Sequence, residues 1–198
     1  MFVADPDAPV AAVAQTARVN IASLYRRFAS KEDMLRKLCH DGLLIYVAVA
    51  REAVANETGD PWEVFVTFME RIVEADTHAL TVKLAGRFEP AEEDIQNAIE
   101  AAALNEQLIA RTQNAGALRD DVNADDLSFV FEQLTSVKAP TPQRTAQLRA
   151  RYLAVQLDGL RSPGHTPLPG PPPTADEQHA RWQPPPRTNP PKRRRTIT

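Results

Sequence analysis

The stretch that decides the fold is residues 9–31, which read PVAAVAQTARVNIASLYRRFASK. Its first part places the apolar side chains of Val13 and Ala14 on one face of a short helix. After a break in that pattern, Asn20 is a favourable N-cap for a second helix over residues 21–28. Two short helices joined by a turn of three or four residues form a helix-turn-helix. The stretch therefore predicts this motif.

The second helix of the motif has an inward and an outward side. Leu24 and Phe28 are spaced i, i+4 and face inward, with Val19 expected to pack beneath them. The predicted core of the motif is Val13, Ala14, Val19, Leu24 and Phe28. Ile21, Ala22 and Arg26 are then left on the outer side of the helix.

The outward residues suit contact with duplex DNA. A small Ala22 lets the backbone approach closely, and Arg26 has the reach and donors for a guanine edge in the major groove. Ser23, Tyr25 and Lys31 can donate to phosphates, which set the register of a complex without reading its sequence.

Composition limits the other functions of the chain. It has 198 residues, 43% of them hydrophobic, which is enough for a real core. A single cysteine, Cys39, excludes an internal disulfide framework and a cysteine-based zinc cluster. No apolar run reaches the roughly 18 residues of a membrane span, and no secretory signal is recognisable at the N-terminus. We expect a soluble, cytoplasmic protein without membrane contact.

Charge and proline divide the chain into three regions. Residues 18–37 hold six cations and two acids, a local charge of +4, whereas residues 52–158 hold 19 acids and nine bases. From residue 163 onward, 11 of the 17 prolines fall in 36 residues, and this stretch is too poor in aliphatic side chains to form a core. We therefore predict a disordered, proline-rich basic tail over residues 162–198. A basic segment before an acidic body favours a polyanionic partner at one end only.

The folded part is predicted to be all-α. Helical apolar spacing recurs along it, no hairpin signal appears, and Ser30, Asp60-Pro61 and Thr141-Pro142 mark helix starts. One such apolar face in the last long helix consists of Leu148, Tyr152, Val155 and Gly159. The expected division is a helix-turn-helix head over residues 1–50, an effector-binding and dimerisation body over residues 51–161, and the tail.

The motif resembles the TetR (tetracycline-repressor-like) family of bacterial transcription regulators. The residues that carry the resemblance are Val13-Ala14, Ala17-Arg18-Val19, Leu24-Tyr25, Phe28 and Lys31, followed by Glu32, Met34 and Leu35. A weaker similarity covers residues 115–122 and 151–161.

The resemblance implies a homodimer that binds double-stranded DNA and a small-molecule effector, with the last two long helices pairing across a two-fold axis. It implies base-edge contacts by Ile21, Ala22 and Arg26, and contacts to the DNA backbone by Ser23, Tyr25, Arg27 and Lys31. The residues that would hold the effector are not identifiable from the sequence.

Two departures from the family pattern stand out. Arg18 occupies the place of the family's turn glycine, where a side chain costs about 1 kcal/mol of strain in a left-handed turn. The family's first helix has no counterpart in the eight residues before Pro9. Either the true start lies upstream, or the head is incomplete and exposes Val10, Val13 and parts of Leu24 and Phe28.

Two alternatives remain at this point. One is a truncated module that dimerises and binds a ligand but no longer binds DNA. The other is a helical prenyl-transfer enzyme, suggested by Asp120, Asp121, Asp125 and Asp126, although a second aspartate-rich cluster, which the metal chemistry usually needs, is missing from the sequence. We predict a regulator with no enzymatic activity, no cofactor and no metal site.

Overall fold

The computed structural model describes residues 7–76, 87–162, 164 and 166–182. Every regular element in these residues is an α-helix, and their one isolated β-bridge joins Leu118 to Arg161. The prediction of an all-α fold is confirmed. Among the helices described, none is both long and apolar enough to cross a bilayer.

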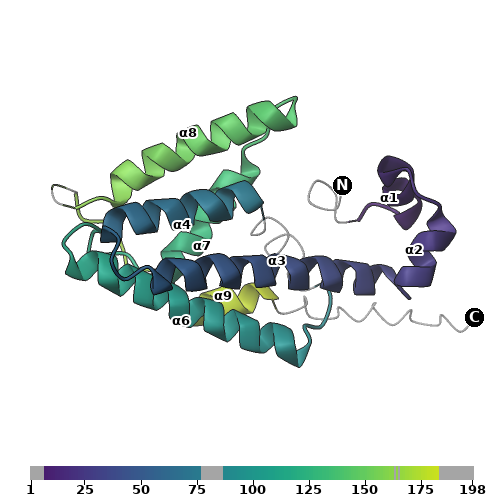
Figure 1. Cartoon of the computed structure of the whole chain (residues 1–198), viewed down its shortest axis with the longest axis horizontal. Coiled ribbons are helices and arrows are strands. Elements are labelled where there is room, and N and C mark those ends of the chain that lie inside the picture. The colour runs from purple at the N-terminus through teal and green to yellow at the C-terminus, as the bar shows by residue number, and fades with distance from the viewer. Residues whose placement is uncertain (1–6, 77–86, 163, 165, 183–198) are drawn as a thin grey trace, which may run out of the picture.

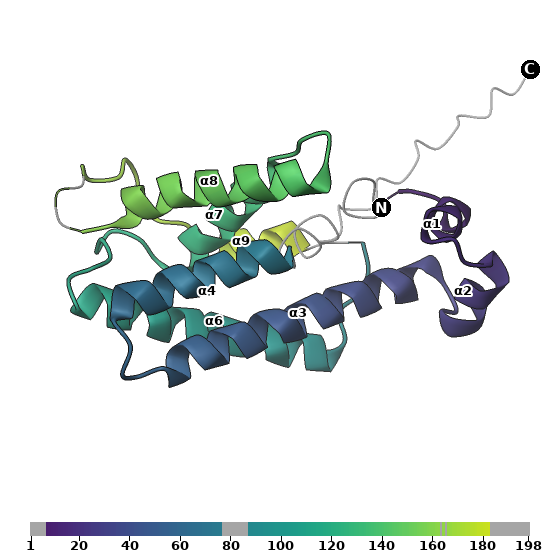
Figure 2. The same ribbon diagram turned by 45° about the horizontal axis from the view of Figure 1, so that its top comes forward.

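Three helices build the first part of the molecule: α1 (Val10–Ala17), α2 (Ile21–Arg27) and the long α3 (Lys31–Ala55). In Figure 1, α3 runs from α2 at one end of the molecule far into the other helices. The turned view of Figure 2 shows α1 and α2 standing apart at that end. We call α1, α2 and the first turns of α3 the head.

Four helices, with the rest of α3, form the body: α4 (Pro61–Ala75), α6 (Glu92–Asn114), α7 (Ala124–Ser136) and α8 (Pro142–Leu160). α3 packs chiefly against α6 and α4, and α4 packs also against α8 (Figure 1). Because α3 is continuous from the head into the body, the predicted boundary at residue 50 falls inside a helix. The structure joins the two parts by a rigid element rather than a linker.

The helix starts follow the local signals in the sequence. Asp60 accepts hydrogen bonds from the backbone amides of Trp62 and Glu63, both at 3.0 Å, with Pro61 in the first turn. Ser30 is the N-cap of α3. The Ser30 hydroxyl accepts from the amide of Asp33 at 3.0 Å, while the Asp33 carboxylate pairs with Arg36.

The centre of the body is filled by aromatic side chains. Phe68 on α4 meets Tyr46 on α3 edge to face, with ring centroids 5.8 Å apart, and Phe131 on α7 lies 6.4 Å from both rings. The Tyr46 hydroxyl accepts a 2.8 Å hydrogen bond from the Asn105 amide on α6, so the buried phenol is satisfied. Burial raises the pKa of Tyr46 well above its usual value, which keeps the phenol neutral.

The apolar face predicted for the last long helix is not the face that α8 buries. Tyr152 is 48% and Val155 61% exposed. The buried positions are Arg149, Leu153, Leu157 and Leu160. The predicted apolar face and the buried face are therefore neighbours, about 100° apart around the helix, because the sequence places apolar side chains on both.

Disorder is predicted too early in the tail. Arg119 donates to the Thr166 carbonyl at 2.8 Å, and the Asp121 carboxylate accepts from the Leu168 amide at 2.9 Å. The Asn123 side-chain amide donates a hydrogen bond to the Pro173 carbonyl at 2.8 Å, and α9 (Ala175–Trp182) begins shortly after this residue. Prolines lower the entropy that a chain loses on ordering, so a few good hydrogen bonds suffice to hold it. Residues 183–198 lie outside the described part of the chain.

Candidate DNA-binding surface

A left-handed residue makes the turn between α1 and α2. Arg18 has φ 56° and ψ 37°, and the amide of Val19 donates back to the Ala14 carbonyl at 3.0 Å, which closes α1. This is the conformation for which glycine is best suited, as the sequence comparison with the family pattern suggested. The turn reverses the chain and allows α2 to cross α1.

Hydrogen bonds at both ends fix the extent of α2. The Asn20 side chain accepts from the Ala22 amide at 2.8 Å, as predicted, and the amide of Phe28 donates to the Leu24 carbonyl at 2.8 Å. After Phe28 the chain passes directly to the Ser30 cap of α3. The two helices of the predicted motif are thus both present in the described chain.

The three residues predicted to touch bases all lie on the exposed side of α2. Ile21, Ala22 and Arg26 are exposed, whereas Leu24 and Phe28 on the opposite side are half-buried. The Ser23 hydroxyl accepts from the Arg26 guanidinium at 2.8 Å, which lays the arginine along the helix surface. Small, apolar and cationic side chains therefore share one accessible face.

The predicted phosphate contacts surround that face. Tyr25 is 54% exposed, and the Arg27 guanidinium lies 5.6 Å from the centre of the Phe28 ring. Lys31 is half-buried at the first position of α3 and close enough to Asp7 to help lower the pKa of that carboxyl, after the larger effect of a hydrogen bond from Arg87. Lys31 is therefore already engaged with an acid, unlike the cations of α2.

Some cations of the head form ion pairs with acids and others do not, so its uncompensated positive charge is concentrated in one place. Arg36 pairs with Asp33 at 2.7 Å, and Lys37 pairs with Asp41, so the cations of α3 are compensated. Within the described residues, no acid forms an ion pair with Arg18, Arg26 or Arg27. The uncompensated charge sits on α2 and on the turn before it.

The core of the motif differs from the prediction at two places. Ala14 is buried, and Val13, Leu24 and Phe28 pack partly against the head cluster of Ala8, Val10, Met34, Leu35 and Cys39. Val19 is 44% exposed and does not pack beneath Leu24, because it stands in the turn that Arg18 reverses. Val10, expected to be exposed, is buried against the start of α3, which covers the face of α1.

Several contacts between the head and the body were not foreseen. Arg87 pairs with Asp7 across eighty positions of sequence, and Phe88 packs on the head cluster. His40 on α3 meets Asp94 at the start of α6, with Nδ1 and Oδ1 2.7 Å apart. No regular spacing in the sequence predicts these pairs. Only the fold brings them together.

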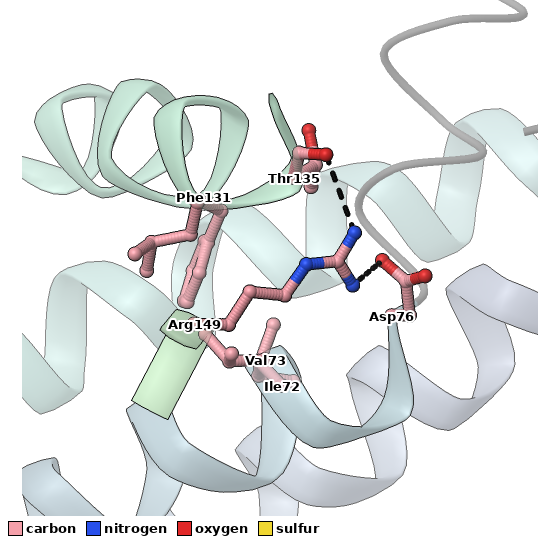
Figure 3. A pocket seen from close by; sticks show the side chains of 7 residues that line it. Ile72, Val73, Asp76, Phe131, Thr135 and Arg149 are labelled. Carbon is pink, nitrogen blue, oxygen red and sulfur yellow. Dashed lines mark hydrogen bonds and ion pairs between the residues drawn. The ribbon is translucent and has the colours of Figure 1, made fainter. Parts of the chain in front are cut away.

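The body contains one further polar feature, a hollow between α4, α7 and α8. Figure 3 shows the Arg149 side chain pointing into it, between Asp76 and the backbone of Thr135. The sequence identified no residue of the body as part of a ligand site, so neither Arg149 nor Asp76 was predicted. Neither residue belongs to a motif that could have singled it out.

Two family models match the chain. The model of the tetR family of bacterial regulatory proteins matches residues 7–38, and the model of the C-terminal domain of SbtR-like transcriptional regulators matches residues 60–162. The second match alone covers more than half of the 198 residues. No curated protein matches the chain.

Solved structures share the fold. The ketosteroid transcriptional regulator KstR2 of Mycobacterium tuberculosis superposes with a TM-score of 0.58 at 22% identity, covering 82% of this chain and 90% of its own. The TetR family regulator SCO0520 of Streptomyces coelicolor gives 0.52 at 21% identity, covering 80% and 90%. The TetR family regulator PfmR of Thermus thermophilus gives 0.51 at 23% identity, covering 78% and 90%.

The family models cover the helix-turn-helix and the body in the order in which the structure places them, and the neighbours share the arrangement of helices. The chain therefore belongs to the TetR family of transcriptional regulators, which bind DNA and are not enzymes.

Proposed function

We propose that the protein is a ligand-responsive repressor that binds a near-palindromic operator as a homodimer in the cytoplasm. The observation that carries this proposal is the exposed, cationic face of α2, whose arginines have no acidic partner in the described chain. Such a face gains the most from an external polyanion, because no internal ion pair has to be broken.

The roles of the side chains follow from their place on α2. Ile21, Ala22 and Arg26 lie on the accessible face and are assigned to base edges in the major groove. The flanking residues assigned to the DNA backbone are Ser23, Tyr25, Arg27 and Lys31. For Lys31, phosphate contact means exchanging its interaction with Asp7 for one with DNA.

The exposed face of α8 supports the homodimer. Tyr152 and Val155 leave large apolar surface uncovered on a helix whose other side is buried in the core. A second copy that covers this face hides the apolar area and places two α2 helices on one duplex. Half-sites read by such a dimer lie about 34–36 Å apart.

The continuous α3 supports a response to a ligand. It starts next to α2 and ends among the body helices, and Arg36 and His40 tie its first half to the chain around α6. A ligand that moves the body helices therefore moves the heads. A small change in their separation removes simultaneous contact with both half-sites.

The test compares two cations after selection of bound sequences from random duplexes. Arg26→Ala is expected to cost about 1–3 kcal/mol on the selected site and to relax the preference at one base pair. Lys31→Ala is expected to weaken all duplexes alike and to reduce the slope of log K against log salt by about 0.9. Binding is measured by fluorescence anisotropy across a salt series.

Arg51→Ala is the matched control, because Arg51 lies on the body half of α3 and pairs with Glu100. It is expected to leave binding unchanged. Equal, salt-insensitive binding by the Arg26 and Lys31 variants contradicts the assignment of roles. A chain that dimerises but binds no duplex contradicts the proposal and favours a ligand-binding module that has lost DNA binding.

A further inference from the structure

We propose that residues 87–90, which lead into α6, fix the orientation of the head on the body and so determine which distance between half-sites the dimer accepts. We call this segment the strut. The inference rests on the proposed binding of a homodimer to two half-sites. It assigns the specificity for spacing to residues that lie outside the helix-turn-helix.

The strut ends in an aromatic side chain that packs on the core of the head. Phe88 contacts the head cluster, whose buried members lie before α1, on α1 and on the first half of α3. Among the described residues in and around this cluster, Phe88 is the only one that comes from beyond α3. Because Phe88 is half-buried, separating the head from the strut exposes apolar surface to water. Packing therefore joins the head to the body in addition to the continuous chain of α3.

Two polar contacts join the strut to opposite ends of the head. The Arg87 guanidinium donates to both carboxylate oxygens of Asp7, at 2.5 and 3.2 Å, shortly before α1 begins. A contact of a guanidinium with both oxygens of a carboxylate fixes direction as well as distance. The Glu89 carbonyl accepts a 3.2 Å hydrogen bond from Arg36 Nε on α3. The strut therefore contacts the chain on both sides of α1 and α2.

The strut itself has little freedom to bend. Pro90 has a fixed φ, and the residue before a proline, here Glu89, is largely restricted to extended backbone. Where α6 starts, the Asp94 carboxylate accepts a hydrogen bond from the Ala91 amide at 3.2 Å and lies 2.7 Å from His40 Nδ1 on α3. The end of the strut that faces the body is therefore joined to both α6 and α3.

This second attachment restricts movements that α3 alone permits. In Figures 1 and 2 the head lies at the far end of the long α3, and α6 begins at the end of the body that faces the head. Bending of α3 would tilt a head that had no other support, whereas a contact away from the axis of α3 opposes the tilt. One base pair moves a half-site by about 3.4 Å and turns it by about 35°. Two heads of fixed orientation therefore accept one spacing.

The experiment measures how strictly each variant selects the spacing. The half-sites found by selection from random duplexes are placed in a series whose spacer is shortened or lengthened by one or two base pairs. Full-length chains are titrated against each duplex, and against a duplex with a single half-site, by fluorescence anisotropy. For the wild type we expect an affinity loss of about tenfold when the spacer changes by one base pair.

Phe88→Ala removes the apolar contact of the strut. It should reduce the penalty for a change of one base pair to about twofold, because each head can then adapt to the altered site. Affinity for the single half-site should stay unchanged, since one head needs no fixed orientation. Phe88→Leu keeps an apolar side chain and should restore strict selection. Arg87→Gln removes only a partly exposed ion pair and should reduce the penalty by about two- to threefold.

Glu89→Ala is the matched control in the same segment. Glu89 is exposed and contacts Arg36 through its backbone carbonyl, which the substitution keeps. This variant should select the spacing like the wild type. If circular dichroism shows that Phe88→Ala does not fold, the relaxed selection by Arg87→Gln and the strict selection by Glu89→Ala still decide.

Strict selection of the same spacing by folded Phe88→Ala and Arg87→Gln overturns the inference and leaves the proposed function intact. Equal losses of affinity on the single half-site and on every spacing also overturn it, because the strut would then only stabilise the fold of the head. A wild-type chain that is indifferent to spacing, or that binds no duplex, contradicts the proposed dimer on its operator as well.

Discussion

The head and the body of this protein hold their helices in different ways. α2 has no fully buried residue, and its inward side chains Leu24 and Phe28 are only half-covered. α4 buries six residues, among them Phe65, Phe68 and Met69 with almost no exposed surface. Caps and partial packing contacts therefore stabilise α2, the helix assigned to DNA. In contrast, α4 at the centre of the body is stabilised by burial in a complete core.

The difference reflects what each part has to contact. A helix that lies in a groove of DNA must keep most of its circumference free for its partner, so it cannot be buried on all sides. A helix at the centre of the body gains rigidity from close packing on all sides. We therefore expect substitutions in the body to lower stability by disrupting core packing. Substitutions in the head should act mainly by weakening the ends of its helices.

The largest expected effect is on the aromatic centre. Phe68→Ala removes a buried ring that touches Tyr46 and Phe131, and should lower the free energy of unfolding by about 3–5 kcal/mol. Urea denaturation followed by circular dichroism measures the loss. The half-buried Phe28→Ala in the head is the comparison and should cost clearly less. Equal losses would remove the contrast between the two regions.

The next effect concerns the segment after α8. Only 7% of the Arg119 side chain is exposed, and the Asp121 carboxylate forms an ion pair with it. The same carboxylate accepts a hydrogen bond from the Leu168 amide. Asp121→Ala leaves the arginine buried without this partner and should cost about 3 kcal/mol. Asp158→Ala, at an exposed position of α8, should change stability little. If both variants unfold at the same denaturant concentration as the wild type, residues 166–173 do not stabilise the body.

A smaller effect is expected at the start of α2. Asn20→Ala removes the oxygen that accepts from the Ala22 amide and should cost about 1 kcal/mol. Asn20→Ser provides a replacement oxygen and should restore most of the loss. The readout is the free energy of unfolding together with affinity for the selected duplex. Unchanged values for the alanine variant would mean that the cap does not hold α2.

The smallest effect has the opposite sign. Arg18→Gly relieves a side chain from a left-handed turn and should raise stability by about 0.5–1 kcal/mol, after the entropy of the more flexible unfolded chain is subtracted. It should also weaken DNA binding slightly by removing a cation. Arg18→Ala keeps the Cβ atom and should show no gain. A glycine variant no more stable than the alanine variant would contradict strain at this turn.

Much of the head was predictable because its signals are local. The Asn20 cap and the outward face of Ile21, Ala22 and Arg26 follow from residues a few positions apart. The left-handed conformation of Arg18 was implied by the resemblance, because Arg18 takes the place of the family's turn glycine. Val19 was placed wrongly because the direction of a turn depends on the chain on both sides of it. The contacts of the head with Arg87 and Phe88 were not predictable, since their partners lie far away in the sequence.

In the body the sequence predicted helices but not their orientation. The last long helix has apolar side chains on two adjacent faces, and periodicity alone does not tell which face turns inward. The same holds for Arg149, which looks like any surface cation of an amphipathic helix. Its burial against α7 and its approach to Asp76 exist only once α4, α7 and α8 are packed together.

The sequence by itself determined the helical class, the helix-turn-helix and its family, because caps, turn residues and apolar spacing act over less than two turns of chain. The tertiary structure alone decided which face of α8 is free, how residues 166–173 dock, and that an arginine and an aspartate meet at the edge of an apolar hollow. These features depend on burial, and burial is a property of neighbours that are distant in the chain.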